Sequence, residues 1–157
     1  MGNGQTTPAV EPADWNGPGG DAARAIRFEV FVDEQKVPAD EEIDAVDPSA
    51  WHVVAWMAGD TDGPREPAAT GRLYGDAADP ALCHIGRMAV RAPWRGVGAG
   101  RAVMEALMAE ARRRGFNRAT LGAQCHALGF YGRFGFAARG PMYDDCGIDH
   151  REMVAEL

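Results

Sequence analysis

The stretch Val90-Arg91-Ala92-Pro93-Trp94-Arg95-Gly96-Val97-Gly98-Ala99-Gly100-Arg101 decides the fold. A β-rich segment ends at its first residue, a proline forces a turn, and three glycines lead into a helix. Such a turn exposes backbone N–H groups at the positive end of a helix, where phosphate oxygens bind readily. Glycine suits it because a side chain would block the approach of an anion to the backbone. The stretch therefore predicts a phosphate site, with Arg95 and Arg101 adding positive charge.

Two common phosphate-binding motifs do not fit this stretch. A P-loop requires Lys and then Ser or Thr after its last glycine, whereas Gly100 is followed by Arg101 and Ala102. A dinucleotide-binding G-x-G-x-x-G motif starting at Gly96 would need glycine in place of Arg101, and it belongs after the first strand of a domain. Neither nucleotide-binding class is therefore supported.

Hydrophobic periodicity predicts the elements on either side of this stretch. Three runs rich in β-forming residues predict strands at 51–58, 68–74 and 82–90, and further strands are expected at 118–121, 136–139 and 152–155. A short helix is expected at 126–134. An amphipathic helix that Gly115 ends is indicated by apolar residues at helical spacing, namely Gly100, Val103, Met104, Leu107, Met108 and Ala111. This order predicts a mixed sheet with helices on both faces.

The N-terminal part is less regular. Residues 1–20 are rich in Gly, Pro, Asn and Thr, which predicts a poorly ordered start with at most one short strand near 9–11. Asp21 is a suitable N-cap for a largely buried helix that runs to about Gln35. The acidic run from Asp40 to Asp47 is either a solvated loop or a surface that attracts cationic molecules. We expect residues 21–157 to form a single domain.

Composition narrows the classes of function. The net charge of −7 argues against general nucleic-acid binding, and no apolar run approaches the roughly 20 residues of a membrane-spanning helix. The start shows no secretory signal. Three widely spaced cysteines, Cys83, Cys125 and Cys146, favour free thiols in a reducing cytoplasm and no structural zinc. We expect a cytoplasmic protein that binds no metal, nucleic acid or membrane and is a monomer or homodimer.

Several motifs resemble those of one family. The pattern (Arg/Gln)-x-x-Gly-x-(Gly/Ala), met from Arg95 to Gly100, resembles the diphosphate-binding motif of the GNAT superfamily of N-acetyltransferases. Segment 121–136, LGAQCHALGFYGRFGF, is similar to the family's second signature, a strand followed by a short helix with Phe-Tyr and then Gly-Phe. VFVDEQ at 30–35, IGRMAV at 85–90 and the tail at 142–153 are similar to the ElaA-type subgroup. The resemblance runs from about Ala22 to Met153.

The resemblance implies both a fold and a cosubstrate. The fold is α/β, with a mixed, mostly antiparallel central sheet, helices on both faces and a splayed pair of parallel strands. Acetyl-CoA would lie between those two strands, one ending at Val90 and the other beginning near Arg118. The residues implied to hold it are Met88, Ala89, Val90, Arg95, Gly96, Val97, Gly98, Ala99, Gly100, Arg101, His126 and Tyr131.

The resemblance also implies direct attack of a neutral amine on the thioester. The Val90 N–H would face the oxyanion, and Tyr131 matches the family's tyrosine that protonates the departing thiolate. The general base stays open between two residues. His84 shares a strand face with Val90 and has a suitable unperturbed pKa, and Glu34 closes the first helix.

Three functions remain open on this basis. The leading one is an acyl-CoA-dependent N-acetyltransferase acting on a small-molecule or peptide amine. The second is a non-catalytic acyl-CoA-binding sensor that keeps the phosphate site without turnover. The third is a structural or interaction domain in which the glycine-rich turn binds nothing.

Overall fold

The computed structural model describes residues 7–58 and 63–157 of the chain. The chain divides into two compact units, Met1–Arg72 with Arg87–Ala106, and Leu73–Gly86 with Leu107–Leu157. The N-terminal stretch 1–20, expected to be poorly ordered, falls partly outside the described residues. Within the described residues, no helix has the length and apolar character needed to cross a membrane.

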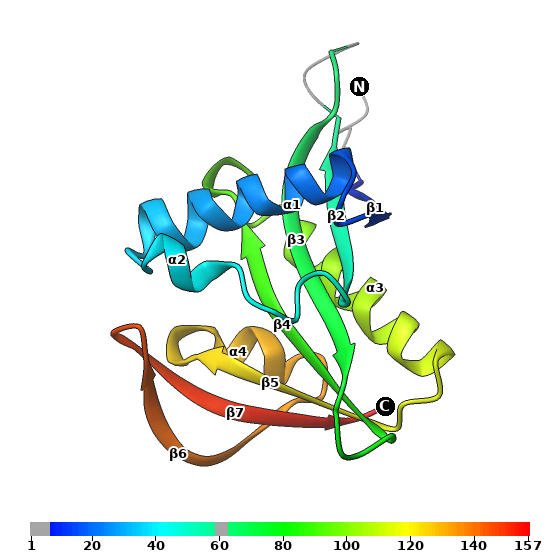
Figure 1. Ribbon diagram of the computed structural model, residues 1–157, viewed down its shortest axis with the longest axis vertical. Coiled ribbons are helices and arrows are strands. Elements are labelled where there is room, and N and C mark those ends of the chain that lie inside the picture. Colours follow the sequence, from blue (N-terminus) through cyan, green and yellow to red (C-terminus); the bar gives the residue numbers. More distant parts are fainter. Residues whose placement is uncertain (1–6, 59–62) are drawn as a thin grey trace, which may run out of the picture. The chain divides into compact units, whose positions relative to one another are not determined.

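Within residues 7–58 and 63–157, seven strands form one sheet in the order β1-β2-β3-β4-β5-β7-β6 (Figure 1). The β1–β2, β5–β7 and β6–β7 pairs are antiparallel. The β4–β5 pair is parallel, with Leu82 opposite Arg118 and His84 opposite Thr120. The strands are β1 (Ala9–Ala13), β2 (Trp51–Met57), β3 (Glu66–Gly75), β4 (Leu82–Val90), β5 (Arg118–Gln124), β6 (Ala137–Asp145) and β7 (Ile148–Glu156). The predicted mixed sheet with a parallel pair is confirmed.

The first helix starts earlier than the sequence predicts. Helix α1 spans Pro18–Arg27, with Gly17 at the N-cap position and no side-chain cap. Proline suits the first turn of a helix because its missing N–H would have no partner there. Asp21 lies inside that turn, where its carboxylate binds Arg24 at 2.6 Å. The prediction that Asp21 caps the helix is therefore wrong.

The same helix changes its pitch after Arg27. Residues Phe28–Glu34 form a π-helix, η1, in which the Gln35 amide donates to the Val30 carbonyl five residues earlier (3.1 Å). Lys36 then takes a left-handed φ of 62° and ends the segment. Short π-helical segments are rare and often occur at functional sites. The short helix α2 (Ala39–Glu42) follows.

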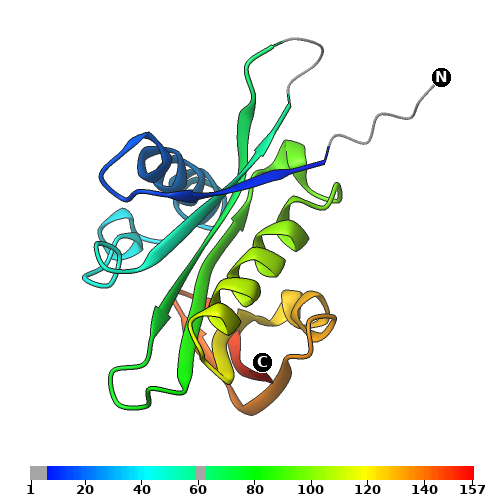
Figure 2. The ribbon, with the colours of Figure 1, turned by 90° about the vertical axis from the view of Figure 1, so that its right-hand side faces the viewer.

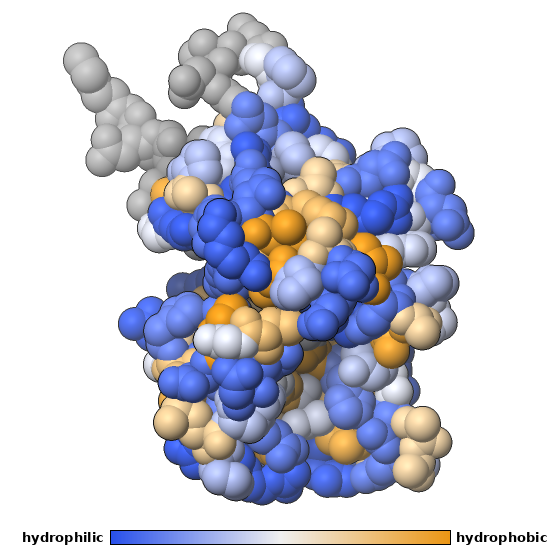
Figure 3. Space-filling view, turned by 60° about the vertical axis from the view of Figure 1, so that its left-hand side comes forward, coloured by the Kyte–Doolittle hydropathy of each residue, from blue (hydrophilic) through white to orange (hydrophobic). Residues whose placement is uncertain are grey.

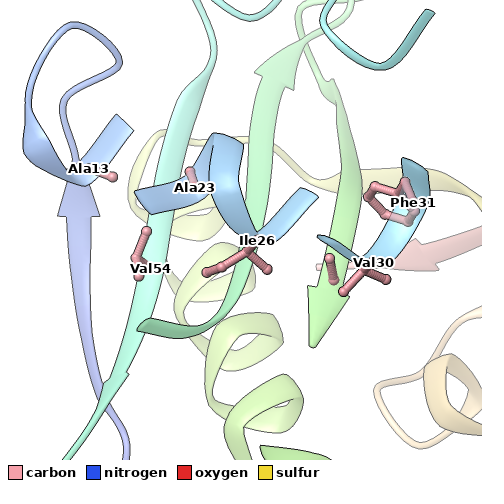
Figure 4. Packing of buried hydrophobic residues seen from close by; sticks show 7 residues of the cluster. Ala13, Ala23, Ile26, Val30, Phe31 and Val54 are labelled. Carbon is pink, nitrogen blue, oxygen red and sulfur yellow. The ribbon is translucent and has the colours of Figure 1, made fainter. Parts of the chain in front are cut away.

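One apolar cluster holds the first unit together. Figure 4 shows Ile26 of α1 and Val30 of η1 pointing toward the sheet that carries Val54. In Figure 2, α1 lies on one face of β1 and β2, and the first turns of α3 (Ala99–Arg113) lie on the other. The cluster consists of Ala13, Ala23, Ile26, Val30, Phe31, Val54 and Ala89. The expected placement of helices on both faces is thus confirmed for this unit.

The second unit contains the C-terminal half of α3 and the last three strands. The helix periodicity was correctly predicted, since Val103, Met104, Leu107, Met108 and Ala111 are all buried. The expected single helix at 126–134 is instead two short pieces, η3 (Cys125–Ala127) and α4 (Leu128–Gly132). Strands β5, β6 and β7 each extend beyond their predicted ends.

The face of the molecule shown in Figure 3 is mostly hydrophilic. Charged and polar residues cover much of the face shown in Figure 3. Among the described residues, the large apolar side chains that stand exposed are Val97, Met142 and Tyr143. Val97 lies in the glycine-rich turn, so the turn is on the surface.

Candidate active site

The glycine-rich turn (residues 95–100) presents its backbone to open space. After β4, the 3₁₀ turn η2 (Ala92–Trp94) redirects the chain, and Gly96 and Gly98 take φ angles of 79° and 92°. L-residues other than glycine rarely adopt such left-handed conformations. A Cβ atom at either position would meet no atom of the described residues within 4 Å. An anion could therefore approach these two glycines from that side.

Helix α3 begins at the end of this turn. The Ala102 amide donates to the Gly98 carbonyl at 3.0 Å, which is the first bond of the helical ladder. The amides of Gly98, Ala99, Gly100 and Arg101 are the first four of the helix, and among the described residues none of them donates to a backbone carbonyl. Unpaired amides and the positive end of the helix dipole together favour an anion at this position.

Arg95 is fixed by two neighbours. Its Nε donates to the Val90 carbonyl at 3.0 Å, and its Nη2 lies 2.7 Å from Oε2 of Glu34. The two side chains are 47% and 35% exposed, so this ion pair is open to solvent and to competing anions. Three predicted site residues, Glu34, Val90 and Arg95, are thus brought together.

A second ion pair joins the same two segments. Glu29 of η1 binds Arg91 at 2.8 Å, and Arg91 also donates to the Pro67 carbonyl at 3.0 Å. Together the Glu29–Arg91 and Glu34–Arg95 pairs attach η1 to the chain on both sides of η2. Arg101, by contrast, is 75% exposed, and within the described residues its one ion pair is with Glu105 of the same helix, so its side chain is little restrained.

The end of β4 combines a buried side chain with an irregular backbone. Ala89 is 3% exposed and belongs to the apolar cluster, which anchors the strand. Arg87, just before Met88, has a left-handed φ of 51° within the strand. Such a conformation interrupts regular strand geometry and costs energy for a non-glycine residue. The backbone at Met88–Val90 therefore follows a local irregularity that the sequence did not predict.

The acidic run from Asp40 to Asp47 is largely neutralised by arginines. Arg27 is 1% exposed and binds Glu42 at 2.8 Å and Asp47 at 2.8 Å. Arg72 binds Asp47 at 2.7 Å and Asp44 at 2.7 Å, and Arg87 lies at the rim, 3.3 Å from Asp44. We call these six residues the buried ion cluster: Arg27, Glu42, Asp44, Asp47, Arg72 and Arg87. Three carboxylates of the run thus face three guanidinium groups. For these three, the expectation of a solvated loop and the expectation of a surface that attracts cationic molecules are both wrong.

Opposing effects act on the carboxylates of this cluster. Burial disfavours the charge of Asp47, but hydrogen bonds from Arg27, the Asp44 amide and Arg72 outweigh it and hold its pKa well below the usual range. Burial raises the pKa of Glu42, although the hydrogen bond and the charge of Arg27 act to lower it. Burial also lowers the pKa of the neighbouring His52, whose Nε2 lies 2.8 Å from the Asp47 carbonyl. The cluster is therefore a structural unit whose charges are already paired.

His84 lies in the second unit and has two well-placed partners. Its Nε2 is 2.7 Å from Oδ1 of Asp76. Its ring stacks on Tyr74, with centroids 4.8 Å apart and an interplanar angle of 4°. The side chains of His84 and Asp76 are both partly exposed. The sequence analysis missed Asp76, although the turn between two predicted strands places it near the start of β4.

Tyr131 lies in α4 among aromatic rings. Its ring contacts Phe130 and Phe136 edge-on, at centroid distances of 5.1 and 6.4 Å. Burial raises the pKa of the Tyr131 phenol to about 12. In the described part of the chain, no hydrogen-bond partner occurs for its hydroxyl. His126, in η3, is exposed.

Sequence comparisons place most of the chain in one family. Residues 23–157 match the family model described as "Acetyltransferase (GNAT) domain". The chain is 33% identical, over 137 residues, to the Bacillus subtilis protein named "Uncharacterized N-acetyltransferase YjcF". That match covers 83% of this chain and 88% of the relative.

Structural comparisons agree with the sequence match. Escherichia coli ElaA superposes with a TM-score of 0.80 and 26% identity, covering 96% of this chain and 100% of that one. An acyl-CoA N-acyltransferase from Pseudomonas aeruginosa superposes with a TM-score of 0.76 and 30% identity, covering 95% and 99%. The predicted motifs, the parallel strand pair and both comparisons therefore agree, and the chain belongs to the GNAT family of acetyltransferases.

Proposed function

We propose that this GNAT enzyme transfers an acetyl group from acetyl-CoA to an amine by direct attack, with the glycine-rich turn holding the diphosphate. The observation that carries the proposal is the start of α3. There, the first four amides of the helix, from Gly98 to Arg101, have no helical partners, and the outer side of Gly96 and Gly98 is open. Acetyl-CoA supplies the activated acetyl thioester when bound.

Further residues would contribute to the same site. The backbone of Met88, Ala89 and Val90 would pair with the extended arm of the cosubstrate, and the Val90 amide would stabilise negative charge on the acetyl oxygen. Val90 is supported for this role because its carbonyl is held by Arg95 and its neighbour Ala89 is anchored in the apolar cluster. His126 is exposed and would contact the cosubstrate from η3.

Tyr131 would give its proton to the departing sulfur. With a pKa of about 12, its phenol stays protonated throughout the neutral range. Its hydroxyl has no competing partner among the described residues, and its ring is held by Phe130 and Phe136. A positioned donor of this kind contributes about 10²–10⁴-fold to the rate.

The amine must lose a proton before or during its attack. His84 is the first candidate for the base and Glu34 is its rival. Glu34 already forms an ion pair with Arg95 at 2.7 Å, so its carboxylate has a partner within the protein. His84 keeps one ring nitrogen, Nδ1, without a partner among the described residues. We therefore propose His84 as the base.

The experiment that tests this function measures release of the CoA thiol with a panel of amines. We expect turnover with at least one amine. Tyr131→Phe should lower kcat by about 10²-fold and leave the affinity for acetyl-CoA nearly unchanged. Tyr143→Phe is the matched control, because this exposed tyrosine has no proposed role in the reaction.

Two outcomes would contradict the proposal. Tight binding of acetyl-CoA with no turnover for any amine would favour the sensor. No heat on titration with acetyl-CoA, together with no rise in Tm, would favour a domain in which the turn binds nothing. A bound ligand at 100 times its Kd should stabilise the fold by about 2.7 kcal/mol.

A further inference from the structure

The hairpin between β3 and β4 fixes Asp76 next to His84. The Asp76 amide donates to the carbonyl of Leu82 at 2.9 Å. Leu82 lies two residues before His84 in β4, so this bond holds Asp76 close to His84. Its Oδ2 accepts the amides of Ala78 and Asp79 at 3.0 and 2.9 Å. Its Oδ1 is thereby left for Nε2 of His84, at 2.7 Å. The two oxygens of one carboxylate thus have separate partners.

The His84 ring is restrained on its face as well as at its edge. Tyr74 of β3 stacks on it nearly parallel, at 4.8 Å. Hydrogen bonds from His84 and from the amides of Ala78 and Asp79 lower the pKa of Asp76, so its side chain is an acceptor at neutral pH. An acceptor at 2.7 Å requires that Nε2 carry the hydrogen. In the neutral ring, Nδ1 then has the lone pair.

We propose that Asp76 is a positioning residue for His84, holding the imidazole in the tautomer that carries the proton on Nε2 and leaves Nδ1 as the base. This inference rests on the proposed function, in which His84 takes the proton of the amine. When Nδ1 accepts that proton, the carboxylate at Nε2 stabilises the resulting imidazolium. An orienting carboxylate acts in this way on the histidine of the serine-protease triad.

Asp76→Asn should reverse the tautomer. The two backbone amides of the turn need an acceptor, so the carboxamide oxygen should take the place of Oδ2. The carboxamide NH₂ then faces Nε2 and donates to it, which forces the hydrogen onto Nδ1. The nitrogen proposed as the base would thus lose its lone pair, although the fold and the ring position stay the same.

The experiment combines ¹⁵N NMR of the histidine side chains with kinetics of CoA release. In the wild type, the ¹⁵N shifts of His84, assigned by comparison with His84→Ala, should show the Nε2–H tautomer; in Asp76→Asn they should show Nδ1–H. The value of kcat should fall by about 10²-fold or more in Asp76→Asn and in His84→Ala. The double variant should be no slower than the slower single variant, because both changes remove one function.

Asp79→Asn is the matched control. Asp79 lies in the same turn, where its side chain accepts the Ala81 amide at 2.9 Å and binds Arg118. In the part of the chain that the structure describes, its side chain forms no hydrogen bond or ion pair with His84. It should leave both the tautomer and kcat nearly unchanged.

Several results would overturn the inference. They are an Nδ1–H tautomer in the wild type, an unchanged tautomer in Asp76→Asn, and full turnover by Asp76→Asn in spite of a reversed tautomer. In each of these cases, release of CoA by the wild type would still support the proposal of acetyl transfer. Absence of wild-type turnover would instead remove the proposed function and the inference together.

Discussion

Two regions of the first unit use the same chemistry, arginine bound to carboxylate, in opposite settings. In the buried ion cluster, Arg27 and Asp47 are 1% and 0% exposed, and their charges are fully paired within the protein. Beside the glycine-rich turn, Arg95 and Glu34 are 47% and 35% exposed. Buried ion-pair partners cannot separate without leaving an unpaired charge in a nonpolar environment. In an exposed pair, an arriving anion can replace the carboxylate as the partner of the arginine. Burial thus separates a structural ion pair from one available to a ligand.

The comparison also distinguishes carboxylates that are bound to arginines within the protein from a carboxylate that lies beside the proposed ligand site. The run from Asp40 to Asp47 is the densest group of carboxylates in the chain, yet three of its members bind arginines. Glu34 stands apart from that run and is the carboxylate that meets the proposed diphosphate site. Density of charge in the sequence is therefore a poor guide to which carboxylates are available to a substrate.

The largest effect is expected in the buried ion cluster. Asp47→Asn should lower the free energy of unfolding by about 3–5 kcal/mol, because it leaves Arg27 and Arg72 buried with too little compensating charge. Urea unfolding would measure the loss. Glu11→Gln, which breaks the exposed pair between Glu11 and Arg65, is the control and should leave the unfolding midpoint nearly unchanged. Equal shifts for the two variants would show that burial does not distinguish the pairs.

The next effect concerns the glycine-rich turn. Gly98→Asp should weaken acetyl-CoA binding by about 100-fold or more, since losing two charge-assisted hydrogen bonds costs at least about 3 kcal/mol. Calorimetric titration would measure the affinity. Gly115→Asp is the matched control, because Gly115 has a similar φ of 88° and equally open surroundings after the opposite end of α3. Retained affinity in Gly98→Asp would remove the turn from the binding site.

The smallest effect is expected at the exposed pair. Glu34→Gln frees Arg95 from its carboxylate, so acetyl-CoA should bind up to about fivefold more tightly, which corresponds to the roughly 1 kcal/mol limit of an exposed ion pair. Titrations at low and moderate salt would measure the change. Glu29→Gln, which releases Arg91 instead, is the comparison variant and should have less effect. Weaker binding in Glu34→Gln would mean that Glu34 supports the turn rather than competing with the diphosphate.

The local parts of this protein were predictable from its sequence. The helical spacing of Val103, Met104 and Leu107 predicts α3, and runs rich in β-forming residues predict β2 and β4. Both patterns depend only on residues close together in the sequence. The glycine-rich turn is also local, since Gly96 and Gly98 supply the required φ angles themselves. The roles of Tyr131 and His126 still come from a resemblance and stay proposals.

Contacts between distant residues were not predictable. The ion pairs between Arg27 and Asp47 and between Arg72 and Asp44 form only when the chain folds. No periodic pattern in the sequence predicts such pairs. The π-helix at Phe28–Glu34 and the left-handed Arg87 depend on tertiary packing in the same way. Asp21 was mistaken for an N-cap because Gly17 and Pro18 begin the helix one turn earlier.

The central claim is that the backbone of the glycine-rich turn binds the diphosphate of acetyl-CoA. Titration of the wild-type protein with acetyl-CoA and with S-acetylpantetheine, which carries the same thioester but no diphosphate, tests it most directly. We expect acetyl-CoA to bind and S-acetylpantetheine to give no measurable heat at the same concentrations. Equal affinities for the two compounds would contradict the claim.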